Sequence, residues 1–119
     1  EQAKKKFEKK VYEKSKFLFQ RNIVFNPKNA ESYLYLAKIF NTEENQEEEE
    51  KNLDTTLLLE PNNEEAIYML INIQLDRSNF DKANTLMDRF TSVCKKMCNK
   101  KKEINKSLQD FEANNAKTN

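Results

Sequence analysis

The fold is decided by residues 26–63, which read NPKNAESYLYLAKIFNTEENQEEEEKNLDTTLLLEPNN. Two prolines, Pro27 and Pro61, stand 34 residues apart, and each follows an acidic or amide residue and precedes an asparagine by one or two positions. A fixed period of this length is typical of helical repeat proteins, in which one repeat is one pair of helices. The stretch therefore predicts two helices, Ala30–Phe40 and Gln46–Glu60, joined by a short polar segment.

Composition favours helix along the whole chain. The sequence has 119 residues, of which 37% are apolar and 34% charged, with no glycine and only two prolines. Glycine and proline are the strongest helix breakers, so their scarcity predicts an all-α protein. The apolar content is low for a compact globule and suits a thin array whose units touch only their neighbours. Periodic apolar positions in every segment argue against disorder.

Residues 1–25 contain no turn signal and predict a helix. Two options stay open, one unbroken helix or a break near Lys9–Val11. Apolar residues recur at helical spacing and predict a broad buried face, which comprises Phe7, Val11, Leu18 and Phe25 with Tyr12, Phe19 and Ile23 beside them.

After Pro61 the scheme starts again, with Asn63 as the predicted N-cap of the next helix and a turn at residues 77–79. From Ala83 onward the apolar positions follow at steps of four and three as far as Phe111, with only Lys101 out of place. This pattern predicts either one long helix from Phe80 to Phe111, or a helix that ends near Cys98-Asn99 and a separate capping helix.

The residues at these positions resemble the tetratricopeptide repeat family, over nearly the whole chain. The family's large apolar residue early in the first helix is met by Tyr33 and Ile67, and its closing proline by Pro27 and Pro61. The remaining matches are Leu36-Ala37, Leu70, Phe40, Ser15, Ala83, Phe19, Leu53 and Met87. Four residues depart from the pattern. A small residue is preferred at the positions of Glu49 and Ile71, an aromatic residue at Gln74 and alanine at Phe90.

The resemblance implies a right-handed stack of antiparallel helical hairpins, a solenoid, with a long or capping C-terminal helix. It would form a single domain over residues 1–113. Its predicted parts are a partial repeat at 1–29, repeats at 30–63 and 64–97, an extended or capping helix at 98–113 and a frayed tail at 114–119.

In this family the first helices of the hairpins line a concave groove that binds peptides or extended segments. The resemblance therefore implies a non-enzymatic scaffold or adaptor that binds a protein or peptide partner. The groove candidates are Glu31, Leu34, Tyr35, Lys38, Glu65, Tyr68, Met69 and Asn72. Tyr35 and Tyr68 are the predicted anchors because rigid aromatic rings are favoured at interfaces. The alternative, that both rings pack between helices, is equally open.

A subset of the family grips the C-terminal tails of chaperones with several Lys, Arg and Asn side chains. Here the corresponding surface offers only Lys38 and Asn72, so the resemblance does not favour a chaperone tail as the partner.

Two other functions are compatible with parts of the sequence. The first is nucleic-acid binding through the lysine clusters at residues 4–6, 9–10 and 100–102. Scarce arginine and an acidic centre, with six glutamates in residues 43–50, disfavour it. The second is a fragment of a larger helical scaffold that assembles or self-associates through its basic ends, since these ends carry surplus apolar residues, namely Phe7, Val11, Ile104, Leu108 and Phe111.

Catalytic, cofactor and metal sites find no support in the sequence. The chain has no histidine and no glycine-rich loop for phosphate. The glutamates of residues 43–50 lack the spacing of a calcium loop. Cys94 and Cys98 are too few for structural zinc and are predicted to be free thiols, which implies an intracellular, reducing compartment such as the cytoplasm. No apolar run is long enough to span a membrane.

Overall fold

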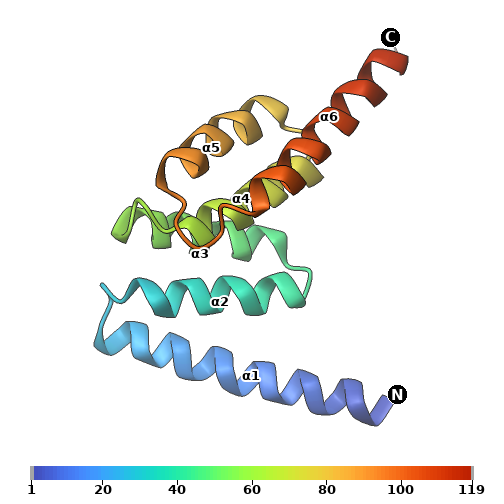
Figure 1. Ribbon diagram of the computed structural model, residues 1–119. Helices are drawn as coiled ribbons and strands as arrows, with labels where there is room; N and C mark the ends of the chain where they lie inside the picture. Colours follow the sequence, from blue (N-terminus) through green and yellow to red (C-terminus); the bar gives the residue numbers. More distant parts are fainter. Residues whose placement is uncertain (1, 119) are drawn as a thin grey trace. The chain divides into compact units, whose positions relative to one another are not determined.

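Six α-helices make up the part of the chain that the computed structural model describes, residues 2–118, and no β-strand occurs there (Figure 1). The all-α prediction is confirmed. The helices are α1 (Gln2–Phe25), α2 (Ala30–Thr42), α3 (Gln46–Leu59), α4 (Glu64–Asp76), α5 (Phe80–Val93) and α6 (Lys100–Thr118).

The helices form two compact units, Glu1–Pro61 with α1 to α3 and Asn62–Asn119 with α4 to α6. In the first unit α2 packs against both α1 and α3, and in the second α4 and α5 pair and α6 contacts both. None of the described helices combines the length and the apolar character needed to cross a membrane.

The two helix pairs have the same lengths at a spacing of 34 residues. Helices α2 and α4 each have 13 residues, and α3 and α5 each have 14. The turns within the pairs also share one geometry. Glu44 and Ser78, at equivalent positions, have φ angles of 59° and 58°. In each turn the next amide donates to the carbonyl five residues back, from Asn45 to Phe40 at 2.9 Å and from Asn79 to Gln74 at 2.8 Å.

Asparagine side chains cap three of the helices. The Oδ1 atoms of Asn29, Asn45 and Asn63 accept hydrogen bonds from backbone amides in the first turns of α2, α3 and α4. Such caps satisfy amides that have no partner inside the helix. The prolines act as predicted, since α1 ends two residues before Pro27 and α3 ends two residues before Pro61.

Two of the departures from the repeat pattern, Glu49 and Gln74, are accommodated by hydrogen bonds. Glu49 is buried on α3, and its Oε2 accepts a hydrogen bond from Asn41 Nδ2 on α2 at 3.1 Å. Gln74 is buried at the end of α4, and its Oε1 accepts from Asn79 Nδ2 in the following turn at 3.0 Å. Ile71 is fully buried. Neither polar residue therefore disrupts its helix pair.

Helix α1 is unbroken, which decides between the two options for residues 1–25. The broad buried face predicted for it is wrong in part. Tyr12, Phe19 and Ile23 are half-buried, but the side chains of Val11, Leu18 and Phe25 are exposed, because α2 packs against the other side of α1. The side chain of Phe7 lies outside the part of the chain that the structure describes.

The chain breaks between α5 and α6, so the single long helix from Phe80 to Phe111 does not form. The break comes earlier than Cys98-Asn99, since Cys94 already has extended dihedrals, φ −62° and ψ 144°. Helix α6 folds back on its unit through buried Ile104 and Leu108, and the Phe111 and Phe80 rings lie 5.1 Å apart. It continues through residues 114–118, where the sequence predicts a frayed tail.

Candidate interaction surface

Tyr35 presents a partly exposed aromatic ring on α2. Its ring stacks on Phe19 of α1 with centroids 5.1 Å apart and an interplanar angle of 8°. Lys38, one turn further along α2, places its Nζ 4.9 Å from the Tyr35 ring centroid. With 40% of its surface exposed, Tyr35 is held in place by neighbours and still offers a ring edge to a partner.

The other predicted residues of α2 lie at helical spacing around Tyr35 but differ in exposure. Glu31 is exposed and Lys38 is half-buried. Leu34 is only 8% exposed, so it contributes to packing and offers a partner almost no surface. The sequence places all three on one stretch of helix but does not separate the buried leucine from the accessible side chains.

Tyr68 on α4 is half-buried and is held by the other two helices of its unit. Its ring lies 6.3 Å from that of Phe90 on α5. Its hydroxyl donates to Glu103 Oε1 on α6 at 3.4 Å, and Lys100 Nζ lies 5.7 Å from the ring centroid. Tyr68 is therefore more enclosed than Tyr35 and takes part in docking α6.

The remaining predicted residues of α4 surround Tyr68 at helical spacing. Glu65 and Met69 are half-buried, and Asn72 is exposed. Together with Tyr68 they give α4 a mixed polar and apolar strip, of which Asn72 is the most accessible part.

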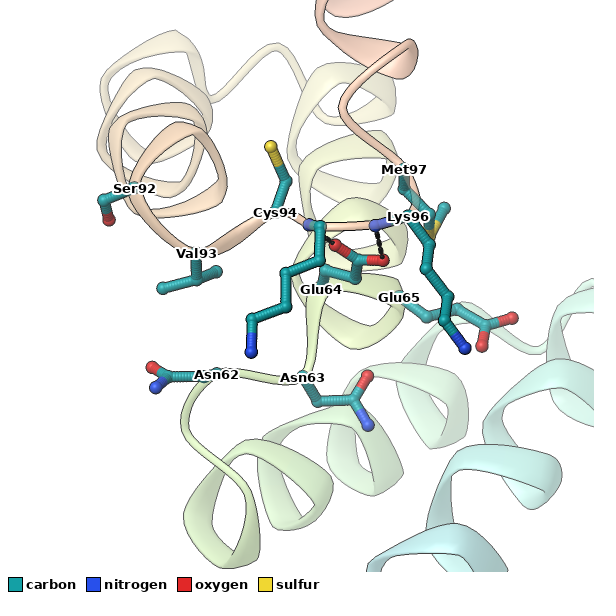
Figure 2. A pocket seen from close by; sticks show the side chains of 10 residues that line it. Asn62, Asn63, Glu64, Glu65, Ser92, Val93, Cys94, Lys96 and Met97 are labelled. Atoms are coloured by element: carbon teal, nitrogen blue, oxygen red, sulfur yellow. Dashed lines mark hydrogen bonds between the residues drawn. The ribbon is translucent and has the colours of Figure 1, made fainter.

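A surface pocket of about 700 Å³ lies in the second unit, where the segment after α5 passes the start of α4 (Figure 2). The Glu64 carboxylate accepts backbone hydrogen bonds from Lys95 and, at 2.9 Å, from Lys96. In Figure 2 this carboxylate points at the chain between Cys94 and Met97. Glu64 thus fixes the segment that links α5 to α6, a role that its place in a first helical turn does not predict.

The prediction that Cys94 and Cys98 are free thiols is wrong. Cys94 and Cys98 form a disulfide, with Cα atoms 5.3 Å apart. The prediction assumed that both cysteines lie on one continuous helix, where the orientation seldom suits a bond. Because α5 ends at Val93, the cysteines lie in a turn that brings the two sulfur atoms together. The irregular position of Lys101 in the apolar pattern is the sequence signal closest to this break.

Residues 2–118, as far as the structure describes them, contain no group of three or more Cys, Asp or Glu side chains that could hold a metal ion. Of the predicted groove residues, Glu31, Tyr35 and Asn72 are exposed, and Phe19 and Lys38 hold the Tyr35 ring in position. Comparison of the chain with known protein families and with curated proteins gives no match.

Proposed function

We propose that the chain is a non-enzymatic interaction module, a scaffold or adaptor that binds a protein or peptide through the first helices of its two helix pairs, α2 and α4. The observation that carries the proposal is Tyr35. Its ring is ordered before any partner arrives, through Phe19 and Lys38, and 40% of its surface remains exposed. A ring with few rotamers to lose is a favourable anchor for binding.

The proposal includes membership of the tetratricopeptide repeat family. It is supported by helix pairs of equal length at a spacing of 34 residues, and by turns in which Glu44 and Ser78 adopt the same left-handed backbone. The buried positions repeat as well, with Leu36 and Ala37 on α2 matched by Leu70 and Ile71 on α4. In that family such pairs stack as a solenoid with a groove, which is the arrangement proposed for this chain.

An intracellular, reducing location belongs to the same proposal. The Cys94–Cys98 disulfide is the feature that opposes it, because disulfides are rare in reducing compartments. Alkylation of the protein in intact cells, followed by a thiol count, decides the matter. If both cysteines are alkylated, they are reduced in the cell, which supports a cytoplasmic location. If both are protected, the disulfide is present and a cytoplasmic location is excluded.

The function is tested by affinity purification of the protein from its native cell with mass spectrometry, comparing wild type with Tyr35→Ala, Tyr68→Ala and Tyr35→Phe. We expect Tyr35→Ala to lose a partner that Tyr35→Phe retains, with unchanged helicity by circular dichroism. Tyr68→Ala should weaken binding less, because its ring is more enclosed. Loss of helicity in both alanine variants would show instead that the rings serve packing.

The nucleic-acid alternative is tested on the same protein. A filter-binding titration with single-stranded RNA and duplex DNA at low salt should show no affinity that falls as salt is raised. Affinity with a steep salt dependence would favour the lysine clusters, of which residues 4–6 and 9–10 belong to α1 and residues 100–102 to α6.

A further inference from the structure

Helix α1 has a second face, whose side chains are exposed and point away from α2. We call it the outer face of α1 and define it by Val11, Lys14, Leu18, Arg21 and Phe25, all exposed. The opposite side of the helix meets α2, through Lys16 against Phe40 and Phe19 against Tyr35. Two further apolar residues flank the outer face, Phe17 and Val24, with exposed fractions of 64% and 78%.

The spacing along this face is that of a helix-binding seam. Val11, Leu18 and Phe25 recur every seven residues, and Lys14 and Arg21 follow the first two by three. This alternation of three and four keeps all five side chains on one line of the helix, where a second helix lying alongside can contact them. In heptad terms Val11, Leu18 and Phe25 occupy a positions, and Lys14 and Arg21 occupy d positions.

The charges on the seam define the chemistry of the partner. Arg21 lies between Leu18 and Phe25, with its guanidinium carbon 5.8 Å from the Phe25 ring centroid. Lys14 lies beside Phe17 in a surface hollow that also contains Glu13, the one carboxylate among its lining residues. A partner that covers the seam takes both cations out of water, which is costly unless it brings opposite charge to them.

A second copy of the chain does not supply that charge. A parallel pair would set Lys14 against Lys14 and Arg21 against Arg21, and an antiparallel pair would set each cation against an apolar residue. A lipid surface is also a poor fit, because Arg21 would be drawn toward the acyl chains together with Leu18 and Phe25. Carboxylates on an apolar helix face match both features of the seam.

We propose that the outer face of α1 docks an amphipathic helix of another protein, whose apolar stripe carries carboxylates opposite Lys14 and Arg21. This surface is distinct from the one around Tyr35 and Tyr68, so the inference goes beyond the proposed function and does not depend on it. Val11, Leu18 and Phe25 supply the apolar contact, and the two cations select the partner and fix its register.

The proposal is tested with fluorescein-labelled synthetic helices of about three heptads, titrated with the full chain and followed by fluorescence anisotropy. One peptide has leucine at a and glutamate at d, and a second has them exchanged, so that both chain directions are covered. Matched peptides carry glutamine in place of glutamate. We expect one acidic peptide to bind at least about tenfold more tightly than its glutamine counterpart, with an affinity that falls as salt is raised.

Variants locate the binding on α1. Arg21→Glu should weaken binding of the acidic peptide by at least about tenfold. It should also create affinity for a peptide that carries lysine in place of glutamate. Leu18→Ser should abolish binding to either. Leu58→Ser, which alters an 82% exposed leucine on α3, is the matched control and should bind as wild type does. All three sites are exposed, so circular dichroism should be unchanged.

Other outcomes overturn the proposal. Equal affinity for the acidic and glutamine peptides, or none for any peptide, removes the electrostatic selection on which it rests. If light scattering shows a concentration-dependent dimer and Leu18→Ser abolishes it, the outer face of α1 binds a second copy of the chain. Co-sedimentation with phosphatidylcholine–phosphatidylserine vesicles that Leu18→Ser abolishes assigns it to a lipid surface.

Discussion

The side-chain amide of Asn41 donates a hydrogen bond to the buried carboxylate of Glu49, 3.1 Å away across the α2–α3 pair. Leu75 and Ala83 hold the equivalent positions in the α4–α5 pair, 34 residues later, and both are buried. One structural position is thus filled by a polar pair in the first unit and by an apolar pair in the second.

The first prediction follows from that equivalence. Asn41→Leu alone removes a donor from a buried carboxylate and should lower the free energy of unfolding by about 1–3 kcal/mol. Asn41→Leu combined with Glu49→Ala reproduces the pair of the second unit and should restore wild-type stability or exceed it. Urea unfolding followed by circular dichroism measures both. A double variant no more stable than Asn41→Leu would contradict the equivalence.

The second prediction concerns the repeated turns. Glu44 and Ser78 have φ angles near 60°, a left-handed conformation that is unfavourable for residues with a Cβ atom. Glu44→Gly and Ser78→Gly should each raise the free energy of unfolding by up to about 1 kcal/mol, because glycine adopts this conformation without steric cost. Glu43→Gly and Arg77→Gly, at neighbouring positions with negative φ, are the matched controls and should lower it.

The third prediction concerns the contact between Glu64 and the segment after α5. Glu64→Ala removes the acceptor for the amides of Lys95 and Lys96 and should speed hydrogen exchange at these two amides. It should also lower the free energy of unfolding by about 1 kcal/mol. Glu31→Ala is the matched control, since Glu31 is an acidic residue in the first turn of α2. If Glu64→Ala and Glu31→Ala lower the free energy of unfolding equally, Glu64 stabilises the protein only through its negative charge at a helix N-terminus.

The fourth prediction concerns the disulfide. The Cys94–Cys98 bond closes a short loop, with a sequence separation of four, so its reduction should lower the free energy of unfolding by no more than about 2 kcal/mol. Far-ultraviolet circular dichroism should change little, because the bond lies between helices and not inside one. Cys94→Ser with Cys98→Ser should match the reduced protein. Loss of most helical signal on reduction would show that the bond is needed for the fold.

Much of the fold could be predicted from residues that act locally. Pro27 and Pro61 end helices through steric effects on the preceding residue, and Asn29 and Asn63 cap the next helices, so both features can be recognised in the sequence. The predicted helices Ala30–Phe40 and Gln46–Glu60 agree within two residues with α2 and α3. Apolar periodicity, together with prolines and N-capping asparagines, is enough to predict a helix and its ends where such residues bound it.

The parts that could not be predicted depend on contacts between distant residues. No glycine or proline marks the break at Cys94, where the backbone is held by Glu64, more than thirty residues earlier in the chain. The accessible side of α1 could not be identified either, since Val11 and Phe19 both fit a helical apolar pattern and only the position of α2 separates them. The same holds for Leu34 and Tyr35, adjacent residues of which one is buried and one half accessible.

Helices α1 and α6 differ in how many large apolar side chains they expose. Residues 100–113 of α6 turn Ile104 and Leu108 inward and expose no large apolar side chain, whereas α1 exposes five, namely Val11, Phe17, Leu18, Val24 and Phe25. Filaments require two complementary adhesive surfaces per subunit, so that each added subunit offers a new one. Because α6 offers no such surface over residues 100–113, α1 has no apolar counterpart on α6, and contacts between these two helices of neighbouring copies do not build a filament.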